Sequence, residues 1–173
     1  MKTKIQSLIF FVLCIAMSSC SSDDDGNTNL TPEGRWLVSS LLVESSFDFN
    51  GDGTTSRDLF EETPCYDGNF IEFFDDGDVI IDIDFTNVYV DINNEQAYQC
   101  QNGFGLTSTW TQDGNTITVE NDDEQGDIVG TISGNTITVT ILNGFEMELY
   151  DEVNDQHVGV TEDFTIIFTK FDE

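Results

Sequence analysis

Residues 113–141 read DGNTITVENDDEQGDIVGTISGNTITVTI and carry the clearest fold signal in the chain. The pairs Gly114-Asn115 and Gly134-Asn135 are typical of tight hairpin turns, and alternating β-branched residues follow each of them. The two segments DGNTITVE and SGNTITVT are nearly alike, which predicts two successive hairpins with the same turn chemistry. Two copies are too few for a solenoid, because repeat folds need about three or more.

The same alternation of short strands and turns extends along the rest of the chain. Asp75-Asp76-Gly77 is a turn signal, and in the segment 78–85 after it Val79, Ile81, Ile83 and Phe85 are expected to share one face. Further strands are predicted at 34–44, 69–74, 88–92, 105–111, 145–149 and 164–171, with a helical turn within 56–62 and a hairpin turn at Asn143-Gly144. About eight to ten strands without a long helical period predict an all-β fold, a single antiparallel up-and-down β-barrel, with a β-sandwich as the alternative.

Acidic residues dominate the charge of the chain. The sequence has 34 Asp and Glu against 5 Lys and Arg, and its formal net charge is −29. Such a chain repels phosphate backbones and anionic lipid headgroups, which argues against nucleic acid as a partner. Cationic ligands and divalent metals remain compatible with this charge, although solubility is its simplest explanation.

The first 19 residues have the pattern of a signal peptide. Lys2 and Lys4 precede the apolar run 5–16, which is too short to span a membrane as a helix. Met17-Ser18-Ser19-Cys20 then resembles a bacterial lipobox, which implies acylation of Cys20 by palmitate-type chains and a mature chain that begins there. A plain secretory signal cut near Ser19 is the alternative.

The segment 20–30 after the cleavage site is short, polar and acidic, and it predicts a disordered tether. A cysteine followed by Ser21-Ser22 and the run Asp23 to Asp25 resembles the surface-export signal of Bacteroidetes lipoproteins. The resemblance implies an outer-membrane lipoprotein that is exposed on the cell surface and touches the membrane through its lipid anchor alone. One folded domain is expected over residues 31–173.

Cys65 and Cys100 are the two cysteines that remain in the predicted domain. An exported compartment permits disulfides, so the simplest prediction is one bridge between them. Two cysteines and the distant His157 supply neither the number nor the spacing of ligands that a zinc site needs.

Gly34-Arg35-Trp36, at the start of the first predicted strand, resembles the G-x-W motif of lipocalins. The order of the other segments is similar to that of lipocalin-like lipoproteins of Bacteroidetes, with Pro64-Cys65, the aromatic strand 69–74, Gly105 to Trp110, Gly114 to Thr118 and Thr169-Lys170. The resemblance covers about residues 30–171. It implies a barrel-closing group of Gly34, Trp36 and Lys170, with the Trp36 ring packed against the Lys170 cation. Plain core packing is the alternative role of both tryptophans.

Two functions follow from this reading of the sequence. The resemblance implies a barrel that binds a small hydrophobic or amphipathic ligand. A barrel of about eight strands is equally able to be filled by its own side chains. It would then be a non-catalytic structural or interaction module that docks a protein or glycan at the cell surface.

Residues 48–58 contain the one candidate metal site. DFNGDG matches the start of a calcium loop, in which Asp48, Asn50, Asp52 and the Thr54 carbonyl would be ligands. The twelfth position, where an EF-hand has a bidentate Glu, is Leu59. Asp58 is the expected substitute, with Glu61 or Glu62 as alternatives. An acidic surface turn is the alternative. No other cofactor is expected.

The sequence offers little for catalysis. His157 is the only histidine and falls in a predicted loop, and no nucleophile motif such as G-x-S-x-G is present. With 34 carboxylates in the chain, the presence of a carboxylate pair indicates nothing about glycosidase activity. The chain is therefore predicted not to be an enzyme.

Overall fold

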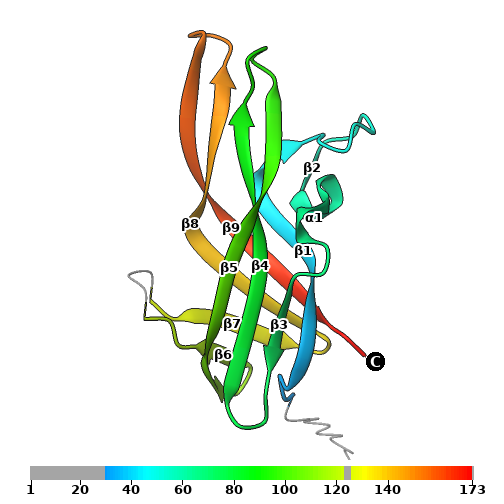
Figure 1. The fold of residues 1–173 in the computed structure, drawn as a ribbon, viewed down its shortest axis with the longest axis vertical. Coiled ribbons are helices and arrows are strands. Elements are labelled where there is room, and N and C mark those ends of the chain that lie inside the picture. The colour runs from blue at the N-terminus through cyan, green and yellow to red at the C-terminus, as the bar shows by residue number, and fades with distance from the viewer. Residues whose placement is uncertain (1–29, 123–125, 173) are drawn as a thin grey trace, which may run out of the picture.

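The computed structural model describes residues 30–122 and 126–172, so the predicted signal peptide and nearly all of the tether lie outside the described residues. None of the helices in these ranges is long and apolar enough to cross a membrane. The elements, in chain order, are β1 (Gly34–Phe47), β2 (Ser56–Asp58), α1 (Leu59–Glu62), the 3-10 turn η1 (Pro64–Tyr66), β3 (Phe70–Phe73), β4 (Asp78–Val90), β5 (Gln96–Asp113), β6 (Thr116–Val119), β7 (Ile128–Ser133), β8 (Thr136–Asp151) and β9 (Gln156–Lys170) (Figure 1).

Eight strands close into an antiparallel barrel, which confirms the predicted fold class. Sheet neighbours follow the order β1-β3-β4-β5-β6-β7-β8-β9, and β1 pairs again with β9 to complete the ring. The additional strand β2 pairs with the end of β1 through Leu42 and Phe47. The result is a lipocalin-like up-and-down barrel with one extra strand.

A register shift between β4 and β5 coincides with a change in which β4 side chains face the core. Val79, Ile81 and Ile83 are buried as predicted, but Phe85 is 43% exposed, so its predicted position on the same face is wrong. The register with β5 shifts between Ile83 and Phe85, and beyond that shift the even-numbered residues, including Val88, are buried instead. At this shift Asn102 and Gly103 of β5 stand opposite Asp84 of β4, so the extra residue of the bulge lies in β5, and the inward alternation of β4 changes beside it.

A second bulge interrupts β8 where the sequence predicts a hairpin turn. Asn143 has a positive φ of 50°, as a turn residue would, yet β8 continues through it to Asp151. The register with β9 shifts between Ile141 and Phe145, so three residues of β8 stand opposite one of β9. The predicted Asn143-Gly144 turn is therefore wrong, because pairing with β9 on both sides of the site holds the chain extended.

The interior of the barrel is packed with side chains. The buried apolar residues form one cluster to which seven of the eight barrel strands contribute fully buried side chains, and β5 adds partly buried Phe104, Leu106 and Trp110. The largest fully buried side chains include Trp36, Phe73 and Phe168. The hydrophobic residues of the two halves of the chain thus meet around one axis.

Gly34, Trp36 and Lys170, the residues of the expected barrel-closing group, lie beside one another. Trp36 is 1% exposed and stands directly opposite Lys170 in the β1–β9 pairing. The Lys170 ammonium lies 5.2 Å from the centroid of the Trp36 ring, a cation–π distance, and Trp36 Nε1 donates to the Pro32 carbonyl. Gly34 has a φ of 103°, which a glycine adopts readily.

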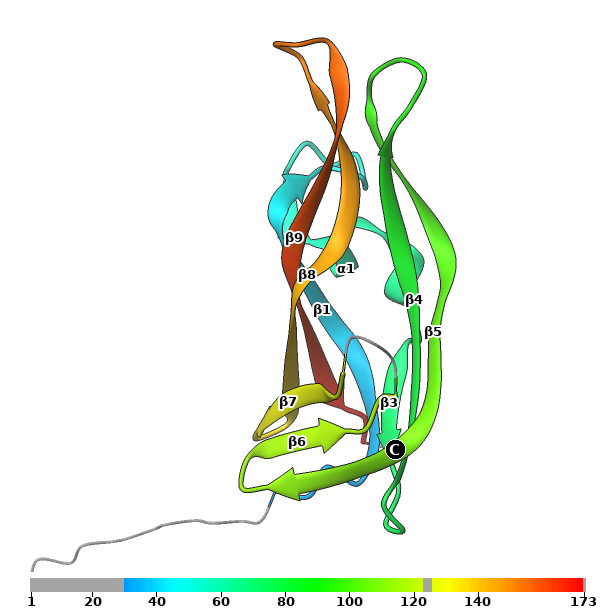
Figure 2. The same ribbon diagram turned by 90° about the vertical axis from the view of Figure 1, so that its left-hand side faces the viewer.

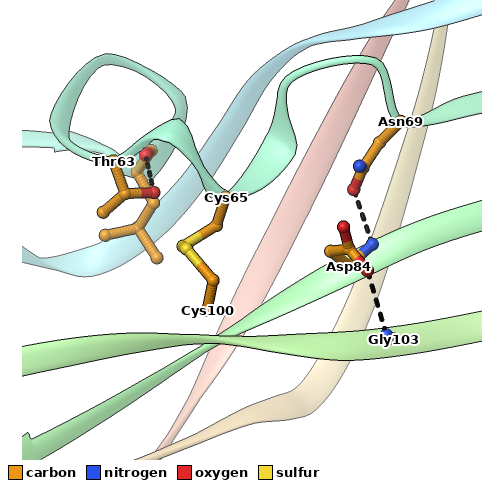
Figure 3. The surroundings of a disulfide bond; sticks show 7 residues. Thr63, Cys65, Asn69, Asp84, Cys100 and Gly103 are labelled. Carbon is orange, nitrogen blue, oxygen red and sulfur yellow. Dashed lines mark hydrogen bonds between the residues drawn. A yellow bond between two sulfur atoms is a disulfide. The ribbon is translucent and has the colours of Figure 1, made fainter.

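The predicted disulfide is present between Cys65 and Cys100, whose Cα atoms are 5.2 Å apart (Figure 3). It links η1 to β5 near the bulge. Beside it, the Asp84 amide donates to Asn69 Oδ1 at 2.6 Å, and the Gly103 amide donates to Asp84 Oδ1 at 3.1 Å. These contacts fasten the bulged part of the β4–β5 hairpin to the segment that precedes β3.

Candidate functional site at the hairpin end of the barrel

Two long hairpins, β4–β5 and β8–β9, extend past the barrel at one end (Figures 1 and 2). The described chain begins at Leu30 near the opposite end, where the Leu30 carbonyl accepts a hydrogen bond from Gln112 Nε2 at 2.7 Å. Each hairpin departs from the barrel at one of the bulges. A Cβ on Gly103 would lie 1.7 Å from the Ile83 carbonyl oxygen, and one on Gly144 would lie 2.5 Å from an Ile141 methyl. Both bulges therefore require glycine.

The two hairpins contact each other beyond the barrel. Val88 of β4 and Met147 of β8 form a parallel bridge. Gln96 Nε2 donates to the Tyr89 carbonyl at 3.0 Å and to the Glu148 carbonyl at 2.6 Å, so one side chain joins both hairpins. The Val90 amide donates in turn to Glu148 Oε2 at 3.3 Å. The hairpins therefore form one projection.

The two tips have similar chemistry. Hydrogen bonds from the Glu95 and Asn93 amides hold the pKa of Asp91 below its ordinary value, and hydrogen bonds from the Asn154 side chain and backbone do the same for Asp151. Each tip also exposes one aliphatic side chain, since Ile92 is 100% exposed and Val153 is 91% exposed. Each tip therefore offers a partner one apolar side chain that is surrounded by acidic residues.

His157 lies between the two hairpins. Its Nδ1 is 3.5 Å from Glu148 Oε2, and its Nε2 is 3.4 Å from Asn94 Oδ1. Nearby, Tyr150 donates to Asp155 at 2.7 Å, and this hydrogen bond raises the pKa of Tyr150. The sequence predicted a loop, but His157 belongs to β9. The two partners of His157, Glu148 and Asn94, come from different hairpins. Neither contact pairs the His157 ring with a serine or cysteine nucleophile.

Two open hollows occur at the same end of the molecule. One, of about 370 Å3, lies between the loop after β1 and the hairpins and is lined by Phe47, Phe49 and Leu149 together with polar residues. The other, of about 570 Å3, lies between β4 and β8–β9 around Val88 and Met147. Both open to the surface, and the packed core lies beneath them.

Two buried carboxylates support this end of the barrel. Glu162 is 8% exposed and accepts hydrogen bonds from the Glu44 and Ser45 amides, both at 2.8 Å, and from the Ser45 hydroxyl. Glu62 is 3% exposed and accepts from the amides of Phe49 at 2.8 Å and Asn50 at 3.3 Å. Neither was expected from the sequence as a buried carboxylate, and Glu62 was expected only as an alternative ligand of the calcium loop. For Glu162 a signal exists, because it shares the inward parity of Phe164, Ile166 and Phe168.

The predicted calcium loop is held together by its own hydrogen bonds. Asp48 Oδ2 accepts from the Gly53 amide at 3.0 Å, Asn50 Oδ1 from the Asp52 amide at 2.9 Å, and Asp52 Oδ1 from the Thr54 amide at 2.7 Å. Asp58 Oδ1 is used elsewhere in the structure, because it accepts hydrogen bonds from the Phe60 amide at the start of α1 and from the Leu41 amide of β1. Within residues 30–122 and 126–172, no group of three or more His, Cys, Asp or Glu side chains is placed to hold a metal.

Calcium binding at residues 48–58 stays a prediction of the sequence. If the loop takes the ion, millimolar calcium is expected to raise the melting temperature relative to EDTA, because an ion that binds only the folded state stabilises it. Asp52→Ala should abolish that rise. Asp76→Ala, which removes an acidic turn residue elsewhere, should keep it. Equal melting temperatures of the native protein in calcium and in EDTA would contradict the prediction.

Tyr66, in η1 beside the disulfide, is 1% exposed, and its burial raises its pKa from 10.0 to about 12, partly offset by Thr86. The folded state therefore keeps a proton that the unfolded chain loses above pH 10. This contribution to stability is complete below pH 10 and is lost as the pH rises towards 12. We expect a loss of about 1 kcal/mol by pH 11. Urea unfolding at pH 8 to 11 measures it.

Tyr66→Phe is the control for this pH effect. Phenylalanine fills nearly the same volume and does not titrate, so the fall in stability between pH 9 and pH 11 should be smaller in the variant by the same amount. Equal pH dependence in the two proteins would show that groups other than Tyr66 cause the fall.

Comparisons with known proteins gave no match at any of three levels. No protein-family model matches the chain, no curated protein matches it, and no solved structure matches it.

Proposed function

We propose that the chain is a non-catalytic interaction module held at the bacterial cell surface by lipid on Cys20, and that its projecting hairpins contact a partner protein. The packed interior of the barrel is the observation that carries this proposal. Trp36, Ile81, Ile137, Phe145 and other apolar side chains from around the ring meet in one buried cluster, which leaves the barrel's interior without the cup that a lipid carrier needs.

The expected orientation of the barrel relative to the membrane supports the same function. Cys20 precedes Leu30 by ten residues, which limits the anchor to about 35 Å from the barrel. Leu30 is hydrogen-bonded to Gln112 near the end of β5, and this end of β5 lies opposite the hairpin tips (Figure 2). A lipid on Cys20 would therefore place the closed end of the barrel towards the membrane and the hairpin tips towards the surroundings.

The charge of the hairpins indicates what kind of protein they fit. The sequence has no Lys or Arg between Asp84 and Asn102 or between Leu142 and Asp163, and both tips carry several carboxylates. Arg35 and Lys170 lie in the part of the barrel nearest Leu30, where Arg35 pairs with Glu72 at 2.7 Å. A partner with a basic surface and a small apolar contact would complement the tips.

Photocrosslinking in intact cells tests this function. p-Benzoylphenylalanine at position 92 or 153 is expected to give a protein adduct of one defined mass, because these side chains project furthest into the surroundings. The same group at position 129, on β7, is the control, since Val129 is also exposed (52%) but lies away from the tips. Adducts of equal yield from position 129 would contradict a role for the hairpin end.

A second measurement tests the lipid-carrier alternative on the same protein. Native mass spectrometry of the purified protein is expected to show no co-purified lipid-like mass, and a fluorescent fatty-acid probe should not bind in its interior. Probe binding with micromolar affinity that Phe47→Ala or Leu149→Ala weakens would move the assignment to a ligand carrier that uses the hollow at the end of the barrel.

A further inference from the structure

Within residues 30–122 and 126–172, one edge of β5 is covered by no other strand along most of its length. On one side β5 pairs with β4 from Gln96 to Thr109. On the other side it pairs with β6 only from Trp110 to Asp113. In Figure 2, β5 forms the margin of the barrel, and β6 meets only its lower end.

The register shows which main-chain groups lie on that edge. The Trp110 amide donates to the Gly77 carbonyl on the β4 side at 2.9 Å, and the Thr109 carbonyl accepts from the Glu120 amide on the β6 side at 3.0 Å. Main-chain groups of an antiparallel strand alternate between its two neighbours. Gly105 and Thr107 therefore direct their N–H and C=O groups away from β4, and both residues are exposed.

This edge also lacks the charges that usually protect one. From Gln96 to Gln112 the sequence has no Asp, Glu, Lys or Arg, in a chain with 34 acidic residues. Natural proteins block exposed edges with charged side chains, proline or a covering segment, because a bare edge adds strands from other chains. The other long uncharged stretch among the described residues, 128–145, lies mostly in β7 and β8, which pair with strands on both sides over residues 130–139.

We infer that the edge of β5 is a self-association site, at which β5 of a second copy pairs antiparallel to it. A two-fold axis through Leu106 places Gly105 of one copy opposite Thr107 of the other, so each exposed donor meets an acceptor. Half-buried Phe104 and Leu106 lie on the core side of the same strand. This interface lies away from the hairpin tips and does not depend on the proposed partner.

Charge makes a second copy the occupant that this edge fits. Two chains of net charge −29 repel each other wherever their acidic surfaces meet, and β5 itself contributes no carboxylate to the contact. The carboxylates nearest to the paired segment are Glu120, which accepts a hydrogen bond from the Thr109 hydroxyl at 2.7 Å, and Asp84, which accepts one from the Gly103 amide at 3.1 Å. The remaining long-range repulsion is screened by salt, with a Debye length of about 10 Å at 0.1 M and about 3 Å at 1 M. Pairing of one short strand segment is weak in solution, and confinement of both copies to a membrane would raise their effective concentration.

Sedimentation velocity on the chain from residue 20 onward, with Cys20→Ser so that no lipid is attached, tests the inference. Between about 10 μM and about 1 mM protein, a monomer–dimer equilibrium is expected. Its association should strengthen on going from about 0.05 M to about 0.5 M NaCl. Thr107→Pro, which removes an edge donor, and Thr107→Asp, which sets like charges near each other, should each weaken association about tenfold or more.

Thr131→Asp is the matched control, because it adds the same charge to an exposed threonine of a strand that pairs on both sides. It should leave the dimer intact apart from a small general effect of charge. A protein that stays monomeric at the highest concentration and salt would overturn the inference. A dimer that both Thr107 variants leave unchanged, with far-UV circular dichroism showing that they fold, would overturn it too and place the contact on another surface.

Discussion

Replacing Trp36 by alanine is expected to lower the free energy of unfolding by about 3–5 kcal/mol, the range seen when a large buried aromatic is removed from a core. The indole is 1% exposed at the closed end of the barrel, where β1 pairs with both β3 and β9. Alanine would leave a cavity at the point where the ring of strands closes. It would also remove the hydrogen bond to the Pro32 carbonyl and the ring beneath the Lys170 ammonium.

Trp110→Ala is the matched control for this experiment. Trp110 has the same side chain and also donates through Nε1, to the Phe74 carbonyl at 3.2 Å, but it is only partly buried. Its removal should therefore cost clearly less. Urea unfolding followed by far-UV circular dichroism gives both values without relying on tryptophan fluorescence. Equal losses in the two variants would contradict the special role of the closed end.

Lys170→Met separates the ring from its cation. Methionine keeps most of the apolar stem and removes the charge, so the expected loss is about 0.5–1 kcal/mol, the range of an accessible cation–π contact. A loss as large as that of Trp36→Ala would mean that the cation, and not the packing of the indole, holds the closed end together.

The strands were predictable where one face of the sheet is buried. The period of Val79, Ile81 and Ile83 and the repeated Gly-Asn turns depend on neighbours in the sequence, and local pattern is enough to read them. The closed end and the disulfide were predictable for a different reason. A G-x-W motif with a late lysine, and two cysteines in an exported chain, leave few partners to choose from.

The bulges were not predictable, because a bulge and a turn share local chemistry. Asn143-Gly144 has the residues and the positive φ of a hairpin turn, and only the pairing of β8 with β9 on both sides makes it a bulge. The same holds for Phe85, whose alternation with Ile83 is intact in the sequence and is broken in the sheet where the register with β5 shifts. Both sites lie within long strands, β4 and β8, that the sequence pattern divided into shorter ones.

The candidate site depends on contacts between segments that are far apart in the chain. Gln96 and Glu148 are ordinary polar residues in the sequence, and their joining of the two hairpins follows from a parallel bridge between β4 and β8 that no local pattern encodes. Glu162 is different. A carboxylate at the inward parity of a strand is buried if the strand is read correctly, and it then needs donors such as the Ser45 amide.

Loss of the Cys65–Cys100 bridge is expected to lower the free energy of unfolding by about 3–4 kcal/mol, because the bridge closes a loop with a sequence separation of 35 residues and restricts the unfolded chain. The loop contains β3, β4, the turn between β4 and β5, and the first residues of β5. A Cys65→Ala, Cys100→Ala double variant is the appropriate test. Cys65 is 4% exposed, so serine there would add a buried hydroxyl and confuse the result.

The native protein in a reducing agent is the control for the double variant, since both lack the bridge while only one lacks the thiols. If the bridge acts through the unfolded chain, both should lose nearly the same stability in urea, and both should keep the far-UV circular dichroism of the folded barrel. Hydrogen exchange then separates this from a local role. A general effect speeds exchange across the core, whereas faster exchange confined to Asp84 and Gly103, whose amides are fastened beside the bridge, would show that the disulfide mainly secures the base of the projecting hairpin.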